Sequence, residues 1–158
     1  MRCIHITEVK KFMGRLLMSG DFDAYLLSEA EIVTFNLFKI SGQIQKKFYS
    51  KEEYESLGSP LWSEWGKIRP LCFEIIKGSR TPLRFKIVLR QNDKEIEKLM
   101  QGNELSYTLE DIGGLYLNFV YENNTLNCIT GTSMNLFTMD KSLEQAWDQY
   151  AEQMLSIY

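Results

Sequence analysis

Histidine is almost absent from this chain of 158 residues, since His5 is the only one. Histidine is the most common metal ligand, and its side chain readily exchanges a proton near neutral pH. A single histidine excludes every metal site that needs several, and it leaves few general bases for an enzyme mechanism. The sequence therefore indicates no metal and no cofactor.

Cysteine is also scarce, and the three that occur, Cys3, Cys72 and Cys128, are widely spaced and form no CxxC pair. An odd number of separated cysteines predicts neither a disulfide framework nor a zinc site. The sequence also lacks a secretory leader pattern at its start and any apolar run near the roughly 20 residues that cross a bilayer. These absences predict a cytoplasmic protein with reduced thiols and no membrane partner.

Neither sign of charge is in large excess, because 18 Lys and Arg stand against 21 Asp and Glu, a net charge of -3. This balance excludes a general attraction to nucleic acid or anionic membranes, so such binding would need a local basic patch. Hydrophobic residues make up 44% of the chain, which is enough to exclude wholesale disorder. The length predicts a single domain, 1–158, with halves of about 1–80 and 81–158.

Two segments, 34–76 and 116–158, show the same pattern of elements at a constant offset. Each predicts two strands joined by a tight turn and then an amphipathic helix that carries a tryptophan. The identical pairs are few: Asn36/Asn118, Leu61/Leu143, Trp65/Trp147 and Ile75/Ile157. The repeat predicts Asn36 and Asn118 at equivalent positions on one face of a sheet, with the two tryptophans under the other face.

Alternating apolar residues predict the strands, and Gly or Asn pairs predict the turns between them. The expected strands cover residues 2–6, 32–38, 43–49, 83–90, 115–122, 125–130 and 134–139, with hairpin turns at Ser41-Gly42 and Asn123-Asn124. Helical spacing predicts the first helix after Thr7 and others after Ser50, Pro60, Asn92 and Lys141. Both halves read strand, helix, hairpin, helix. We therefore expect an α+β fold: a mainly antiparallel sheet with helices packed on one face.

Four runs of the sequence resemble a family of uncharacterised small bacterial proteins, known as a domain of unknown function. The runs are Ile32–Phe38, Arg69–Gly78, Thr81–Leu89 and Asp140–Trp147. The likeness covers essentially the whole chain. It implies a stand-alone bacterial cytoplasmic protein and carries over no activity, cofactor or catalytic residue.

The most promising surface is basic, because seven cations and one acid, Glu74, lie between Lys67 and Arg90. If the apolar residues of strand 83–90 face the helices, the alternate residues must project from the open side of the sheet. Side-chain direction then predicts a ligand-binding or partner-binding face made of Asn36, Lys47, Arg84, Lys86, Arg90, Tyr116 and Asn118. An ordinary half-solvated sheet face is the alternative interpretation.

Three smaller clusters carry weaker signals. Cys3 and His5 share one face of the first strand and could form a nucleophile and base, although a structural role is favoured. The acidic pairs Asp21/Asp23 and Glu29/Glu31 match no calcium loop, so the sequence favours a solvated loop over a cation site. The turn from Lys77 to Thr81 could meet an anion through Lys77 and Arg80, but it lacks a phosphate-loop spacing and reads as a plain connection.

The sequence leaves three functions open. The leading hypothesis is a non-enzymatic protein that binds another macromolecule or a small ligand through the open sheet face. The second is a nucleic-acid-binding module that uses the same face. The third is an enzyme of unrecognised type, with Cys3, His5 or the Asp21/Asp23 region in a cleft. A homodimer is a further arrangement that the sequence allows.

Overall fold

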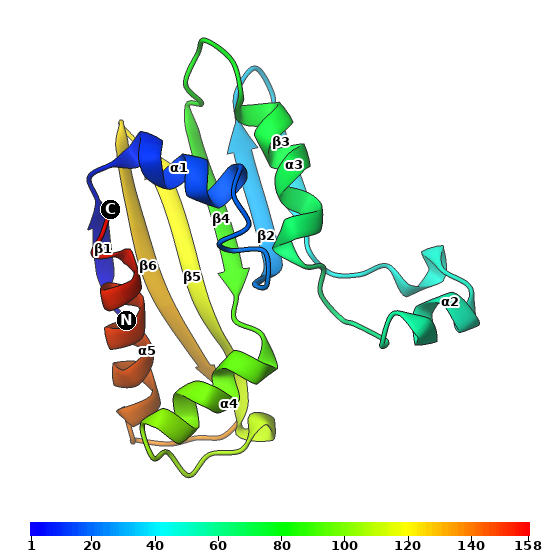
Figure 1. Cartoon of the computed structure of the whole chain (residues 1–158), viewed down its shortest axis with the longest axis vertical. Coiled ribbons are helices and arrows are strands. Elements are labelled where there is room, and N and C mark those ends of the chain that lie inside the picture. Colours follow the sequence, from blue (N-terminus) through cyan, green and yellow to red (C-terminus); the bar gives the residue numbers. More distant parts are fainter.

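A computed structural model describes the whole chain, Met1–Tyr158, as a layer of helices on one antiparallel sheet (Figure 1). The strands are β1 (Cys3–Ile6), β2 (Leu26–Val33), β3 (Leu37–Ser41), β4 (Arg84–Arg90), β5 (Ile112–Glu122) and β6 (Thr125–Met134). The helices are α1 (Val9–Leu17), α2 (Lys51–Ser56), α3 (Trp65–Ile76), α4 (Asp93–Gly102) and α5 (Ser142–Leu155), with one-turn 3₁₀ helices at Lys46–Phe48 and Leu109–Asp111. The predicted α+β class, with a mainly antiparallel sheet and helices on one face, is confirmed.

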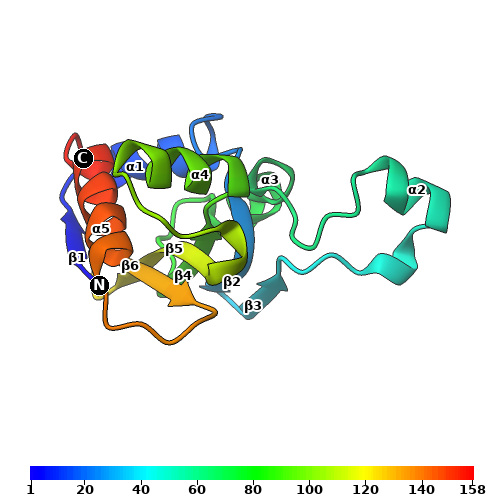
Figure 2. The same cartoon turned by 90° about the horizontal axis from the view of Figure 1, so that it is seen from below.

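The strands lie in the order β1-β6-β5-β4-β2-β3, and every neighbouring pair is antiparallel. Along the chain each half reads strand, helix, hairpin, helix, apart from the added α2. The positions within the sheet do not repeat, because β4 pairs with both hairpins whereas β1 lies at the far edge against β6. Figure 2 shows the sheet curling around α1, α4 and α5.

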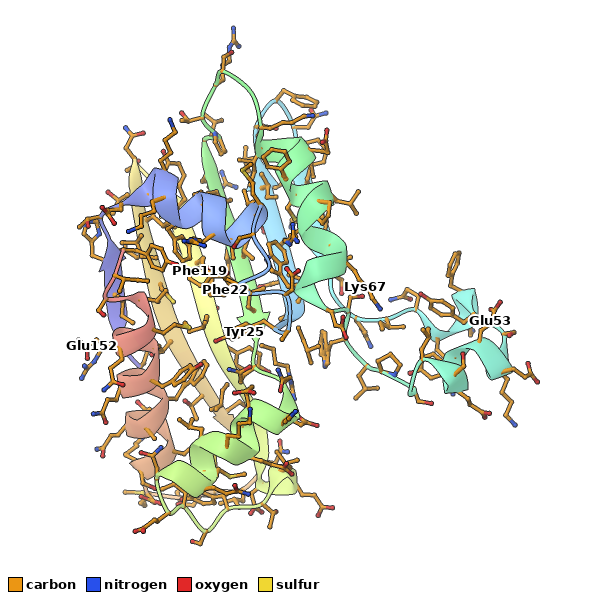
Figure 3. The ribbon with its side chains drawn as sticks, viewed as in Figure 1. Phe22, Tyr25, Glu53, Lys67, Phe119 and Glu152 are labelled. Carbon is orange, nitrogen blue, oxygen red and sulfur yellow. The ribbon has the colours of Figure 1, made fainter.

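The core fills the space between the sheet and these helices. On β4 and β5 every second side chain points to it: Phe85, Ile87, Leu89, Leu115, Leu117 and Phe119 are all buried. The rings of Phe22 and Phe119 meet edge to face with centroids 5.9 Å apart, and Figure 3 shows them between the sheet and α1. Glu53, Lys67 and Glu152 point away into solvent in the same view. The period-2 pattern therefore matches the observed burial.

The tryptophans of segments 34–76 and 116–158 that were expected at equivalent positions lie under the helix-covered face, as predicted. Trp65 is fully buried and its Nε1 donates to the carbonyl of Leu16 at 2.9 Å. Trp147 is 1% exposed and its Nε1 donates to the carbonyl of Tyr116 at 3.0 Å. Each tryptophan thus combines a large apolar contact with a satisfied N–H, which suits it to a core position.

The first hairpin has a different turn from the one predicted. Val33 pairs with Leu37, so the chain reverses at residues 34–36 and not at Ser41-Gly42. Gly42 serves another purpose, because a Cβ built on it would lie 1.7 Å from the carbonyl oxygen of Leu27. The close approach of two backbones, rather than a tight turn, requires glycine there.

This shift changes the faces of the residues nearby. Asn36 lies in the turn, so it does not occupy a position equivalent to Asn118 on β5, and that prediction is wrong. Phe38 pairs with Ile32 and shares its helix-covered face. The expected strand at 134–139 is also absent, because β6 ends at Met134 and an irregular segment follows.

Residues 43–62 form an arm that leaves the body of the protein (Figures 1 and 2). The two ends of the arm meet in a bridge between Gln43 and Trp62, and Ile44 N–H donates to the carbonyl of Leu61 at 2.9 Å. Helix α2 lies at the tip and begins with a capping box of Ser50 and Glu53, after the predicted start at Ser50. Lys47 belongs to this arm, where the sequence had predicted a second hairpin strand.

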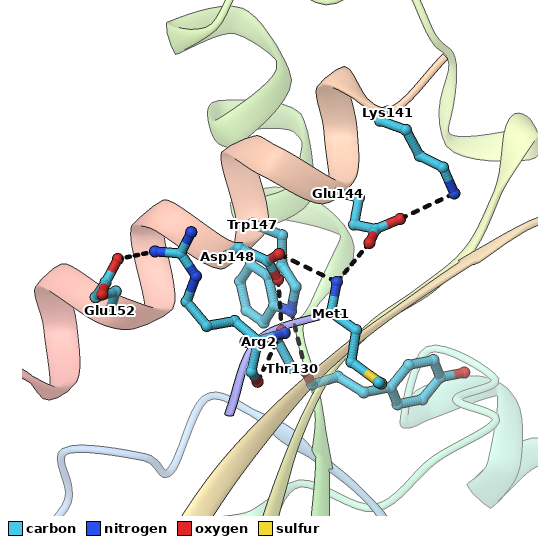
Figure 4. A network of polar contacts seen from close by, with 9 residues as sticks. Met1, Arg2, Thr130, Lys141, Glu144, Trp147, Asp148 and Glu152 are labelled. Atoms are coloured by element: carbon cyan, nitrogen blue, oxygen red, sulfur yellow. Dashed lines mark hydrogen bonds and ion pairs between the residues drawn. The ribbon is translucent and has the colours of Figure 1, made fainter. Parts of the chain in front are cut away.

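A polar network holds the first residues of the chain against α5 (Figure 4). The Met1 ammonium donates to Glu144 and Asp148, and the hydroxyl of Thr130 donates to Asp148. Arg2 pairs with Glu152 one turn further along the helix. Hydrogen bonding to the ammonium holds the pKa of Glu144 below its ordinary value. The carboxylate of Glu144 is therefore favoured in the folded state.

Glu144→Gln should lower the free energy of unfolding at neutral pH by less than about 1 kcal/mol, as expected for an exposed ion pair. The pKa of Glu144 is lower in the folded than in the unfolded state, so the stabilisation is present above the unfolded pKa. It should be lost as pH falls through the folded pKa. Urea unfolding of both proteins across acid pH measures this difference. Glu97→Gln on α4 serves as the control, because Glu97 itself forms no ion pair. A pH-independent difference between wild type and Glu144→Gln would contradict the assignment.

Candidate binding face of the sheet

The face of the sheet opposite the helices is uncovered (Figure 2), and we call it the open face. It carries every second side chain of the central strands. Its polar and aromatic members include Glu29, Glu31, Lys39, Arg84, Lys86, Arg90, Tyr116 and Asn118. These residues come from four neighbouring strands, so the register of the sheet fixes their spacing.

Five of the seven predicted binding residues lie together on this face. Arg90 pairs with Tyr116 across the β4–β5 ladder, and Asn118 lies opposite Val88 between Lys86 and Arg90. Arg84 is at the start of the same strand. The other two predicted residues lie elsewhere, Asn36 in the β2–β3 turn and Lys47 in the arm. The sequence placed both residues on this face because its pattern predicts the hairpin turn at Ser41-Gly42, whereas the chain reverses at residues 34–36.

Three of the four cations of the open face lie near acids, and Arg90 is the exception. Lys86 Nζ lies 3.0 Å from Glu29 Oε1, and Arg84 Nη2 lies 3.7 Å from Glu31 Oε1. Lys39 Nζ is 4.0 Å from the other oxygen of Glu31. Strand β2 supplies both acids, which the sequence had placed in a loop. The face therefore has alternating charge and is not the basic patch that the count of cations suggested.

Arg90 lies between two aromatic rings. Its guanidinium carbon is 5.8 Å from the ring centre of Tyr116 and 5.9 Å from that of Trp62, at the root of the arm. Its Nη1 also donates to the Tyr116 hydroxyl at 3.1 Å. Cation–π contacts and this hydrogen bond hold the guanidinium in one orientation. The sequence did not identify Trp62, because no local pattern shows that the arm returns beside β4.

Gly114 makes room for the ring of Tyr116. A Cβ on Gly114 would lie 2.6 Å from the Tyr116 hydroxyl oxygen. The ring therefore lies back over the Gly114 backbone. Behind it, the carbonyl of Tyr116 accepts the hydrogen bond from Trp147, and the side-chain amide of Asn118 donates to the carbonyl of Ile129 at 2.8 Å. This support fixes the site on rigid strands.

The residues considered for catalysis are engaged in other contacts. His5 Nδ1 lies 3.1 Å from the side-chain oxygen of Asn127, on the strand next to it. Asp23 holds Arg69 through two hydrogen bonds, of 2.6 and 3.1 Å, and Asp21 pairs with Arg15 at 3.5 Å. No group of three or more His, Cys, Asp or Glu side chains is placed to hold a metal ion.

Two of the three thiols are also unsuited to nucleophilic chemistry. Burial raises the pKa of the Cys72 thiol to about 12 and also raises that of Cys128. Desolvation disfavours the thiolate, which is the reactive form. The third thiol, Cys3, is exposed on β1 at the edge of the sheet. The geometry thus gives Cys72 and Cys128 a packing role.

Residues 15–158 match the sequence model of a family of unknown function, DUF5721. The chain belongs to this family. The match confirms the resemblance to a domain of unknown function, and the DUF5721 region includes every residue of the open face. Searches among curated proteins and among solved structures found no match. No helix of this DUF5721 protein combines the length and the apolar character needed to cross a membrane.

Proposed function

We propose that this protein is a non-enzymatic binding protein whose partner is another protein, held on the open face. The observation that carries the proposal is the arrangement of Arg90 between Trp62 and Tyr116. Tryptophan, tyrosine and arginine are the side chains most enriched among residues that dominate binding energy at protein interfaces. All three are partly exposed and are fixed by rigid strands or by each other, so little side-chain entropy is lost on binding.

The charge pattern favours a protein over a polyanion as the partner. Nucleic acid would be attracted by unpaired cations, but Glu29 and Glu31 neutralise Lys86 and Arg84 on this face. A surface of alternating charge can instead match a partner of complementary pattern and reject others. The sheet also curls away from the open face, which suits a broad contact better than a deep small-molecule site (Figure 2).

We also propose that the protein works in the cytoplasm of a bacterium. The resemblance to small bacterial proteins supports this origin. Three free thiols support a reducing compartment, because secreted domains of this size commonly pair their cysteines.

The triple variant Arg84→Ser, Lys86→Ser, Arg90→Ser should lose its partner while it keeps the fold, since all three side chains lie at the surface. The wild type and the variant are used as bait in the cells of origin, the partner is identified, and its Kd is measured with both purified proteins. Removal of one residue that dominates an interface costs at least about 2 kcal/mol of binding free energy. We therefore expect the Kd of the variant to be at least about 30-fold weaker than that of the wild type.

The matched control also removes three positive charges, but from the helices on the opposite face of the sheet. It carries Lys11→Ser on α1 and Lys94→Ser and Lys98→Ser on α4. This control should retain the partner. A second variant, Gly114→Ala, keeps every charge but forces the Tyr116 ring to move, and it should also weaken binding. Equal partner affinity for all four proteins would refute the proposal, and a shift of DNA or RNA probes at low salt would favour nucleic acid instead.

A further inference from the structure

A second site lies at the other side of the sheet, between the start of α1 and the connection from α3 to β4. It is a pocket of about 370 Å³. Its apolar walls come from three separate segments: Val9 and Met13 of α1, Ile76 at the end of α3, and Pro82. Pockets that hold small molecules start at roughly this size and have mainly apolar walls.

The floor of the pocket is rigid and apolar. Phe85 on β4 and Tyr121 on β5 line it, and their rings stack with centroids 5.2 Å apart and planes within 13°. Phe85 is 4% exposed and Tyr121 is 8% exposed, so both rings are held by the core. A ligand would meet two fixed aromatic surfaces, and the loss of side-chain freedom on binding would be small.

The rim of the pocket is positive. Lys10 on α1 and Arg80 in the α3–β4 connection both line the opening, and neither forms an ion pair. Ser79 and Thr81 also line the pocket, and no Asp or Glu contributes to the lining. By contrast, Arg84 and Lys86 on the open face are paired with glutamates. The charge of Lys10 and Arg80 is therefore left for a ligand.

We propose that this pocket binds an amphipathic anion: a carboxylate or phosphate monoester head on an unbranched apolar chain. The head is held at the rim by Lys10 and Arg80, whose guanidinium suits two-point contact with either group. The chain lies on Phe85 and Tyr121. This site is independent of the partner surface proposed above, because its polar residues come from α1 and the α3–β4 connection rather than from the open face.

The sequence pointed to part of this site. The turn from Lys77 to Thr81 had the composition of an anion-binding turn but no phosphate-loop spacing. The structure adds what the turn lacked, a second cation from α1 and an apolar floor. Lys77 itself is not in the lining and pairs with Glu74 at 2.7 Å.

The probes are sodium octanoate and octyl phosphate. Two controls separate the parts of the ligand: 1-octanol has the apolar chain without the charge, and acetate has the carboxylate without the chain. Calorimetry gives the Kd, and backbone amide shifts at Gly78 and Ser79 report the site. One of the two anions should bind at least tenfold more tightly than 1-octanol or acetate, and the tighter anion identifies the head group. Each further methylene should strengthen binding roughly fourfold until the pocket is filled.

The variant Lys10→Gln/Arg80→Gln should weaken binding of the preferred anion at least tenfold. Both side chains are exposed, so the fold should be unaffected. The matched control Lys11→Gln/Lys77→Gln removes two neighbouring cations that already have acidic partners, and it should bind like the wild type. Met13→Trp should fill the pocket and abolish binding. Unchanged affinity in the Lys10/Arg80 variant, or equal affinity for 1-octanol and both anions, would overturn the proposal.

Discussion

Trp147→Ala should lower the free energy of unfolding by about 3–5 kcal/mol, the range observed for deletion of a buried large aromatic side chain. Trp147 is 1% exposed between α5 and the sheet, and its ring stacks on Tyr150 with centroids 5.5 Å apart. The substitution removes this packing and leaves a cavity. It also removes the hydrogen bond of 3.0 Å that Trp147 Nε1 donates to the carbonyl of Tyr116.

Chemical denaturation monitored by circular dichroism measures this loss. Trp147→Phe separates the two contributions, because it keeps most of the apolar contact and removes the N–H. It should cost less, about 0.5–1.5 kcal/mol, the usual net contribution of one hydrogen bond. Trp62→Ala is a control for loss of a tryptophan outside the core, since Trp62 is only partly buried. A loss below about 1 kcal/mol in Trp147→Ala would contradict a core position for Trp147.

Gly42→Ala should destabilise the protein by about 3 kcal/mol, the upper part of the usual range for overpacking. The new Cβ would lie 1.7 Å from the Leu27 carbonyl oxygen, which belongs to the backbone and cannot rotate away. Relief of the clash must separate Gly42 from its neighbours. This movement breaks the hydrogen bonds from Gly42 N–H to Ser28 at 2.9 Å and from Ser63 N–H to Gly42 at 2.8 Å.

The matched control is Gly14→Ala in α1. A Cβ on Gly14 meets nothing within 4 Å, and alanine is favoured over glycine inside a helix by about 0.5–1 kcal/mol. The same chemical change should therefore stabilise the protein at one site and destabilise it at the other. Thermal unfolding of the two variants tests this opposition of sign, which equal shifts of Tm would disprove.

The sequence predicted β4 and the β5–β6 hairpin well because local rules decide them. Asn123 and Asn124 adopt φ angles of 52° and 60°, which is the left-handed conformation that a type I′ turn needs and asparagine tolerates. Strand β4 alternates cleanly between core and solvent from Arg84 to Leu89, with Val88 the exception. In these segments each residue's environment follows from its immediate neighbours.

The first half was harder to predict because contacts distant in sequence decide it. Ser41-Gly42 has turn composition, but Gly42 is required by the backbone of Leu27. A bulge between Leu27 and Glu29 interrupts the alternation of β2, which hid the first part of this strand. Glu29 and Glu31, which pair with Lys86 and Arg84 on the open face, were therefore placed in a loop. Five of the candidate residues were still found together, because they lie on β4 and β5.

The position of β1 has a consequence for the order in which the sheet is assembled. This first strand pairs only with β6, so Cys3 must pair with Ile129, which lies far from it in the sequence. During synthesis from the N-terminus, β1 has no partner strand until β6 has been made. The β2–β3 and β5–β6 hairpins can form from near neighbours, but the last edge of the sheet must close by a long-range encounter, which slows folding.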